Sequence, residues 1–293
     1  MTPRHILLAI SVPLIWGLGV TFTKAALSEF PPVLLMAIRF ALTALLLVWF
    51  VRPPVAILGK LFWIALISAT IQYSLTFYGL KGLDASTAVL VLQLEAPFAV
   101  LLAVIFLKER LTLRRVVGML IAFAGVALIV GEPRLEGAID SLLLVMSGAF
   151  IWAVGQVMIR ALGVASGMTL IAWVAVLATP QLFIAAFIIE DVSWDLITGA
   201  GWVVWATIAY LGVIMTALGY GIWYHLLGRL PVNQVAPFLL LLPVVTVSSG
   251  IVLLGETLTP LIALGGLVVI VGVAVIVIER NPFASVPARQ EGE

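Results

Sequence analysis

Ten long apolar segments dominate this sequence and constrain its fold more than any other feature. A helix of about 20 apolar residues spans about 30 Å of hydrocarbon, whereas a membrane-spanning barrel strand needs only about ten residues. Charged residues make up only 10% of the 293 residues, against about 25% in soluble domains. We therefore predict an all-α membrane protein with ten transmembrane helices and no sizeable soluble domain. The segments cover approximately residues 5–27, 32–51, 61–80, 86–106, 113–131, 138–160, 166–189, 201–227, 232–254 and 259–278.

Lysine and arginine are distributed unevenly between the two sets of loops. If the N-terminus is cytoplasmic, the outer loops contain only Lys24, Lys81 and Arg134. Cytoplasmic loops of membrane proteins carry an excess of these residues, so we predict that both termini lie inside. The cytoplasmic loops and tail would then contain Arg4, Arg52, Lys60, Lys108, Arg110, Arg114, Arg115, Arg160, Arg229, Arg280 and Arg289.

The two halves of the sequence resemble each other at a nearly constant spacing. Tyr73 and Tyr220 are 147 residues apart. At the same spacing, the run GMLIAFAGVALIV (118–130) matches GGLVVIVGVAVIV (265–277) at seven of thirteen positions. Matches between apolar residues arise easily by chance, but a spacing shared with a tyrosine and several glycines indicates an internal repeat.

Each half contains five predicted spans, which determines how the halves are related. An odd number means that the second half enters the membrane from the opposite side, as an inverted repeat. This architecture suits alternating access, with a binding site near the midplane between repeats. We predict repeats over 1–131 and 132–280 and a disordered cytoplasmic tail over 281–293. Pro97 and Pro243 indicate interrupted helices at roughly corresponding places.

The fourth span carries polar groups at membrane depth. Gln93, Glu95 and Pro97 lie in its middle, and a carboxylate there costs about 2.5 kcal/mol even on insertion scales that give low values. A proline also frees a backbone carbonyl that protein or water must satisfy. We expect this segment to face an interior cavity. The alternative is a structural kink in which Glu95 pairs with an interior cation such as Arg39.

Several motifs resemble a known family. They are Ile15-Trp16-Gly17, Ile38-Arg39-Phe40, Glu109-Arg110-Leu111, Trp152 and the run Leu254-Gly255-Glu256-Thr257-Leu258. This set is similar to the EamA type of the drug/metabolite transporter superfamily, over nearly the whole chain. The run Gly219-Tyr220-Gly221-Ile222-Trp223 looks like bacterial exporters of amino-acid metabolites, including cysteine, O-acetylserine and aromatic amino acids. The resemblance implies ten spans and export of small metabolites.

The candidate site residues are polar or aromatic groups inside the spans. Aromatic walls with sparse polar groups suit a zwitterion with an apolar side chain, although packing within the bundle explains the tryptophans equally well. The arginine is either structural or a clamp for a carboxylate. The expected substrate-binding residues are Trp16, Arg39, Tyr73, Phe77, Gln93, Glu95, Trp152, Gln156, Thr216 and Tyr220.

Other residues favour structural roles. Tyr224 lies near the cytoplasmic end of its span, where an interfacial aromatic belt is the better interpretation. Glu109 and Glu256 each begin a Glu-x-Leu-Thr motif, whose threonine is expected to cap the next helix. Glycines of the fifth and tenth spans allow close helix contact, within the chain or with a second copy.

We therefore predict a secondary transporter that exports amino acids or related small metabolites across the bacterial inner membrane. No phosphate-binding loop, metal-spaced His or Cys set, or catalytic triad is present, so we expect no catalytic residues, cofactor or metal. The net charge of +1 gives no field to attract nucleic acid. Partners are a small substrate and the lipid bilayer, in a monomer or homodimer. Alternatives are transport of sugar phosphates, nucleotide sugars or amphiphilic drugs, or a membrane enzyme or sensor.

Overall fold

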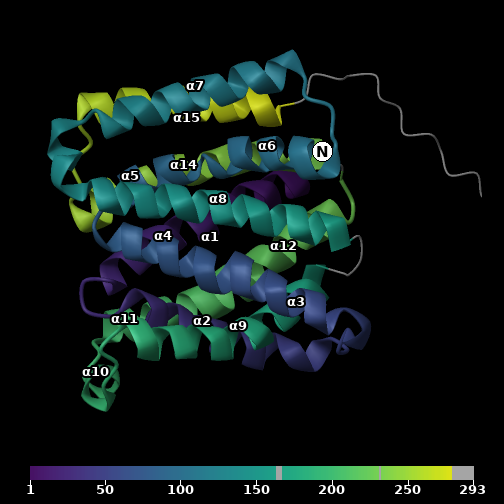
Figure 1. Cartoon of the computed structure of the whole chain (residues 1–293), viewed down its shortest axis with the longest axis vertical. Coiled ribbons are helices and arrows are strands. Elements are labelled where there is room, and N and C mark those ends of the chain that lie inside the picture. Colours follow the sequence, from purple (N-terminus) through teal and green to yellow (C-terminus); the bar gives the residue numbers. More distant parts are fainter. Residues whose placement is uncertain (163–166, 231, 279–293) are drawn as a thin grey trace, which may run out of the picture.

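The computed structural model describes residues 1–162, 167–230 and 232–278, and this part of the chain folds as helices and short connections without a strand (Figure 1). Ten helices are long and apolar enough to cross a membrane. The predicted all-α fold with ten spans is therefore confirmed. The predicted tail over 281–293 lies outside the described residues.

One long α-helix forms most or all of six spans, of which the second also includes η1 (Val48–Phe50) and the sixth η4 (Pro133–Ala138), and four spans are built from several consecutive helical segments. These long helices are α1 (Pro3–Ala26), α2 (Pro32–Leu47), α7 (Leu113–Val130), α8 (Ile139–Leu162), α9 (Gly167–Ile189) and α15 (Pro260–Val277). The third and fourth spans comprise α3 (Leu58–Ala65), η3 (Leu66–Ile71) and α4 (Gln72–Lys81), then α5 (Ala85–Leu92) and α6 (Glu95–Leu107). The eighth and ninth comprise α11 (Trp202–Ala209), η5 (Tyr210–Tyr220) and α12 (Gly221–Leu227), then η6 (Ala236–Leu240) and α14 (Leu241–Leu254). Short connecting helices are η1 (Val48–Phe50), η2 (Val55–Ile57), η4 (Pro133–Ala138), α10 (Trp194–Thr198) and α13 (Val232–Val235).

The connections that follow α6 and α14 are built alike. Lys108 and Gly255 end these helices in the left-handed conformation. Thr112 and Thr259 then begin α7 and α15, and each hydroxyl accepts a hydrogen bond from the backbone N–H three residues later. The predicted threonine caps are confirmed. Because both helix ends recur at a spacing of 147 residues, the sequence repeat is also a repeat of local structure.

Helices α7 and α15 pack closely and antiparallel through glycines, at one end of the long axis in Figure 1. A Cβ atom on Gly118 would lie 2.8 Å from the carbonyl oxygen of Gly272, and one on Gly125 would lie 2.7 Å from that of Gly265. Such contacts require glycine on both helices. These glycines are therefore occupied by packing within one chain, which leaves the dimer face suggested by the sequence without support.

The first and sixth spans cross in opposite directions. At the end of α1, the Lys24 ammonium donates hydrogen bonds to the carbonyls of Leu80 and Lys81, at the end of α4. The adjoining Gly82 lies against Ser141, at the start of α8. Span one thus ends where span six begins, as an inverted repeat requires. Packing between helices does not define which side faces the cytoplasm, so the inside position of both termini stays a prediction.

Candidate functional site

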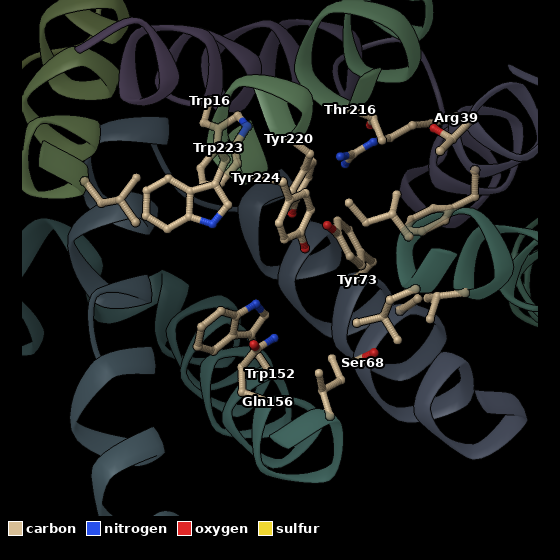
Figure 2. A pocket seen from close by; sticks show the side chains of 18 residues that line it. Trp16, Arg39, Ser68, Tyr73, Trp152, Gln156, Thr216, Tyr220, Trp223 and Tyr224 are labelled. Carbon is tan, nitrogen blue, oxygen red and sulfur yellow. The ribbon is translucent and has the colours of Figure 1, made fainter. Parts of the chain in front are cut away.

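A cavity of about 360 Å³ lies inside the bundle, between helices from both halves of the chain (Figure 2). Helices α1 and α2 and the third span form its walls together with α8, α9 and the eighth span. Most of the lining is aromatic or aliphatic, with a few hydroxyl and amide groups and one cation. Seven of the ten residues predicted as site residues line this cavity: Trp16, Arg39, Tyr73, Trp152, Gln156, Thr216 and Tyr220.

Aromatic rings form a continuous wall on one side of the cavity. The ring of Trp16 lies 4.8 Å from that of Tyr220 and 5.9 Å from that of Trp223, measured between centroids. Tyr220 in turn stacks on Tyr224 at 6.2 Å. Figure 2 shows Trp152 and Gln156 across the cavity from this group. A small ligand would therefore lie between aromatic faces supplied by both halves.

Two π-helical segments, η3 and η5, lie at corresponding places in the two halves. Wider turns of this kind occur often at functional sites. In η5, the Thr216 hydroxyl donates to the carbonyl oxygen of Leu211, five residues earlier, at 2.7 Å. The Met215 carbonyl accepts a hydrogen bond from the Trp16 indole at 3.3 Å. The π-helical turns thus orient two of the lining residues.

Among the described residues, Arg39 is the single cation in the cavity wall, and it is 3% exposed. Its guanidinium carbon lies 5.2 Å from the ring centroid of Tyr73 and 5.6 Å from that of Phe40. Its terminal nitrogens lie 3.7 Å from the sulfur atoms of Met36 and Met215. Among the described residues no carboxylate lies within ion-pair distance of Arg39. The alternative in which Glu95 pairs with Arg39 is therefore absent from this structure.

Three predicted site residues do not line the cavity. Phe77 is buried behind Tyr73 and stacks on it at 5.5 Å between centroids. Gln93 and Glu95 lie where α5 ends and α6 begins, outside the wall. The chain turns there before Pro97, so the helix break precedes the proline. Roles for these three residues stay predictions.

The helix breaks of the fourth and ninth spans correspond closely. Pro97 is the third residue of α6 and Pro243 is the third residue of α14. Proline is tolerated in the first turn because the N–H that it lacks has no partner there. Both prolines therefore begin the second part of an interrupted span, and do not kink its middle.

Several lining residues were missed or misinterpreted from the sequence. Tyr224, which was expected in an interfacial belt, lines the cavity together with Trp223. Its spacing of four residues from Tyr220 places both on one helix face, which was the available signal. Thr43 follows Arg39 at the same spacing and was not singled out. Ser68 lies in η3, and nothing in the sequence indicated a π-helical turn there.

In the part of the chain that the structure describes, ten helices that could span a membrane surround a central cavity, an architecture typical of multi-pass membrane transporters. The chain matches the model of the EamA-like transporter family over residues 3–131 and 140–278, and it belongs to this family. The resemblance seen in the motifs is thereby confirmed. Membership makes the chain a membrane transporter and not an enzyme.

Relatives and a solved structure are similar over nearly the whole chain. Probable amino-acid metabolite efflux pumps of Salmonella typhimurium and Escherichia coli are each 33% identical over 283 residues, covering 93% of this chain and 94% of the relative. A probable terminal-alkyne amino-acid exporter of Streptantibioticus cattleyicolor is 29% identical and covers 73% of this chain and 72% of the relative. A solved crystal structure has a TM-score of 0.65 and 18% identity over 94% of this chain and 96% of its own, which shows the fold alone.

Proposed function

We propose that this protein exports amino acids or related small metabolites across the bacterial inner membrane by alternating access. The observation that carries the proposal is the aromatic cavity between the halves, with its sparse polar groups and single guanidinium. The names of the relatives support the same substrate class. In this proposal the working units are the two repeats, 1–131 and 132–280, which move against each other around the cavity.

Contacts between the halves close one end of the cavity. The Glu256 carboxylate accepts hydrogen bonds from the backbone N–H groups of Ala85 and Ser86 at 2.6 and 3.0 Å, and also from the Ser86 hydroxyl. It thereby caps α5, a helix of the other half. We call this set of contacts the Glu256 latch. Beside it, Arg134 bridges Asp84 and Thr257.

The corresponding glutamate at the other end makes different contacts. Glu109 forms ion pairs with Arg160 and Arg115, whose side chains are partly exposed. The cavity extends toward this end, because its lining includes Ile159 near the end of α8 and Leu170 near the start of α9. A latch at one end and a cavity reaching toward the other support a resting state open on the predicted cytoplasmic side.

Purified protein in liposomes tests the proposal directly. We expect time-dependent movement of labelled neutral amino acids, with competition by related metabolites. A panel of metabolites that includes sugar phosphates and amphiphilic drugs distinguishes the alternatives. Because sugar phosphates usually need several cations and the described lining has one, we expect them to compete poorly. Absence of flux for every amino acid and metabolite would contradict the proposal.

Flux in the presence and absence of a pH gradient tests the energy coupling. Glu95 is the carboxyl group at membrane depth on the fourth span, and it is our candidate for carrying a proton. If it does, Glu95→Gln abolishes flux driven by the pH gradient and leaves exchange without a gradient intact. Equal pH-driven flux in both proteins would exclude Glu95 as the proton carrier, and wild-type flux that does not respond to the gradient would indicate facilitated diffusion.

A further inference from the structure

The surroundings of Arg39 are unusual for a buried charge. Buried charges in proteins are normally paired and hydrogen-bonded, because removing an ion from water costs several kcal/mol. A guanidinium has five N–H donors, yet the hydrogen bonds found for Arg39 go to two thioether sulfur atoms, which are weak acceptors. The side chain has an incomplete set of partners in the protein alone.

The same contacts hold the guanidinium in a fixed position. Met36 lies one turn before Arg39 on α2, whereas Met215 reaches it from η5. The faces of Phe40 and Tyr73 lie within cation–π range. In Figure 2 the Arg39 guanidinium points toward Tyr73 and Tyr220 and into the cavity. Apolar groups orient the cation without using its strongest donors.

Among the described residues, no Asp or Glu side chain lines the cavity beside this charge. Glu95 and Arg39 both interact electrostatically with Tyr220, but no ion pair joins them. Helix α9, which packs against α2, carries no Lys or Arg along its length. The positive charge therefore lies on the α2 side of the cavity and not on the α9 side. This gives a bound anion one preferred orientation.

On the basis of the proposed export function, we infer that Arg39 is the anchor for the substrate's carboxylate. A planar guanidinium matches a carboxylate with two parallel hydrogen bonds. The rest of the substrate then lies against the aromatic wall, and its side chain extends toward Trp152 and Gln156 on α8. Its ammonium, on the same carbon as the carboxylate, stays near Arg39 and faces the rings of Tyr73 and Tyr220, whose π faces can hold a cation without a carboxylate. A free carboxylate thus becomes a requirement for binding, beyond amino-acid character in general.

The first experiment varies the ligand and leaves the protein unchanged. Wild-type protein in liposomes transports a labelled neutral amino acid, and the unlabelled acid competes with its primary amide and with the amine that lacks the carboxyl group. Because a bidentate charged pair is among the stronger interactions in a protein, we expect the amide and the amine to compete about 10- to 100-fold more weakly. Equal competition by the acid and the amide would overturn the anchor.

The second experiment varies the residue. Arg39→Met keeps an unbranched stem and removes the charge. We expect it to weaken competition by the acid about 10- to 100-fold but competition by the amide by less than about threefold. Arg39→Lys keeps the charge but lacks the two parallel N–H donors of the guanidinium, and we expect it to weaken competition by the acid less than Arg39→Met does. Arg52→Met removes one exposed arginine outside the cavity and should change neither value.

These experiments separate failure of the anchor from failure of the proposed function. Flux in wild type with no preference for the acid over the amide overturns the anchor and leaves export standing. No flux of any compound in wild type overturns the export proposal and the anchor with it. Size-exclusion profiles in detergent check that Arg39→Met folds, and the ligand series in wild type does not depend on that variant.

Discussion

The Glu256 latch predicts a defined change in the balance between the two open states. Glu256→Gln keeps the shape of the side chain but replaces one acceptor oxygen with an NH₂ group. That group cannot accept from Ala85 or Ser86, and it faces their N–H donors. We expect the variant to favour the state in which the latched end is open.

The structure gives the size of this effect. Hydrogen bonds to a charged group contribute about 1.5–3 kcal/mol each, and the substitution removes one such acceptor and weakens the remaining bonds. Glu256 is partly exposed, so solvent screening reduces its contribution. We expect a loss of about 2 kcal/mol for the latched state, which is about a 30-fold change in the equilibrium.

Labelling of an introduced cysteine measures this equilibrium. The chain has no cysteine, so Ser249→Cys gives a unique thiol. Ser249 is buried between α14 and α1, where its hydroxyl lies 2.6 Å from that of Thr21. It lies on the side of the cavity nearer the latch. A water-soluble maleimide should label it slowly in the parent protein and about 30-fold faster with Glu256→Gln.

Two further variants test the cause. Glu136→Gln changes an exposed carboxylate at the same end and should leave labelling unchanged. Gly250→Ala keeps the charge, but its Cβ would press against the Glu256 carboxylate and lie 2.9 Å from the Ser86 hydroxyl, so labelling should accelerate. Unchanged labelling in both Glu256→Gln and Gly250→Ala would refute the reasoning that Glu256 holds this end closed.

Three other substitutions give simple outcomes. Gly265→Val should lower the free energy of unfolding in detergent by about 1–3 kcal/mol, because its Cβ would lie 2.8 Å from the Gly125 carbonyl oxygen. An unchanged melting temperature would contradict close packing of α7 against α15. Glu190→Ala should cost about 1 kcal/mol, because this carboxylate accepts the first N–H groups of α2, whereas Asp191→Ala, at an exposed neighbour, should cost nothing. Trp152→Ala should raise the KM for a neutral amino acid about 10-fold, with Trp152→Phe intermediate; equal KM values would remove it from the site.

Much of the fold follows from the sequence because lipid imposes strong rules. A membrane span needs about 20 apolar residues and must satisfy its own backbone, so the ten segments could be delimited by inspection. The threonine caps at Thr112 and Thr259 follow from the same kind of local rule. Spans and helix caps depend only on residues close together in the sequence, so they can be predicted from it.

The site was harder to predict, because its composition depends on where helices are interrupted and rotated. A single π-helical turn rotates every later side chain on a span, and no residue pattern announced η3 or η5. Ser68, which lies in η3, lines the cavity without such a signal, whereas the spacing of Tyr224 from Tyr220 was a usable one. Conversely, Gln93 and Glu95 are polar groups that are costly in a lipid span, but their cost indicates only that they avoid lipid. It does not place them in the wall of the cavity.

The two halves differ in some of the residues that line the cavity and would bind the exported substrate. Elements that recur at a spacing of 147 residues, such as Glu109 with Glu256 and η3 with η5, lie at the ends of the cavity or in its supporting turns. At the cavity wall, Tyr73 and Tyr220 keep this correspondence, but Ser68 occupies the place of Met215, and α9 has no counterpart of Arg39. In the proposed mechanism, the similarity between the halves lets the state open at one end of the cavity be exchanged for the state open at the other end. Because the cation belongs to one half only, a carboxylate would keep the same anchor in both open states, and release would depend on water reaching Arg39.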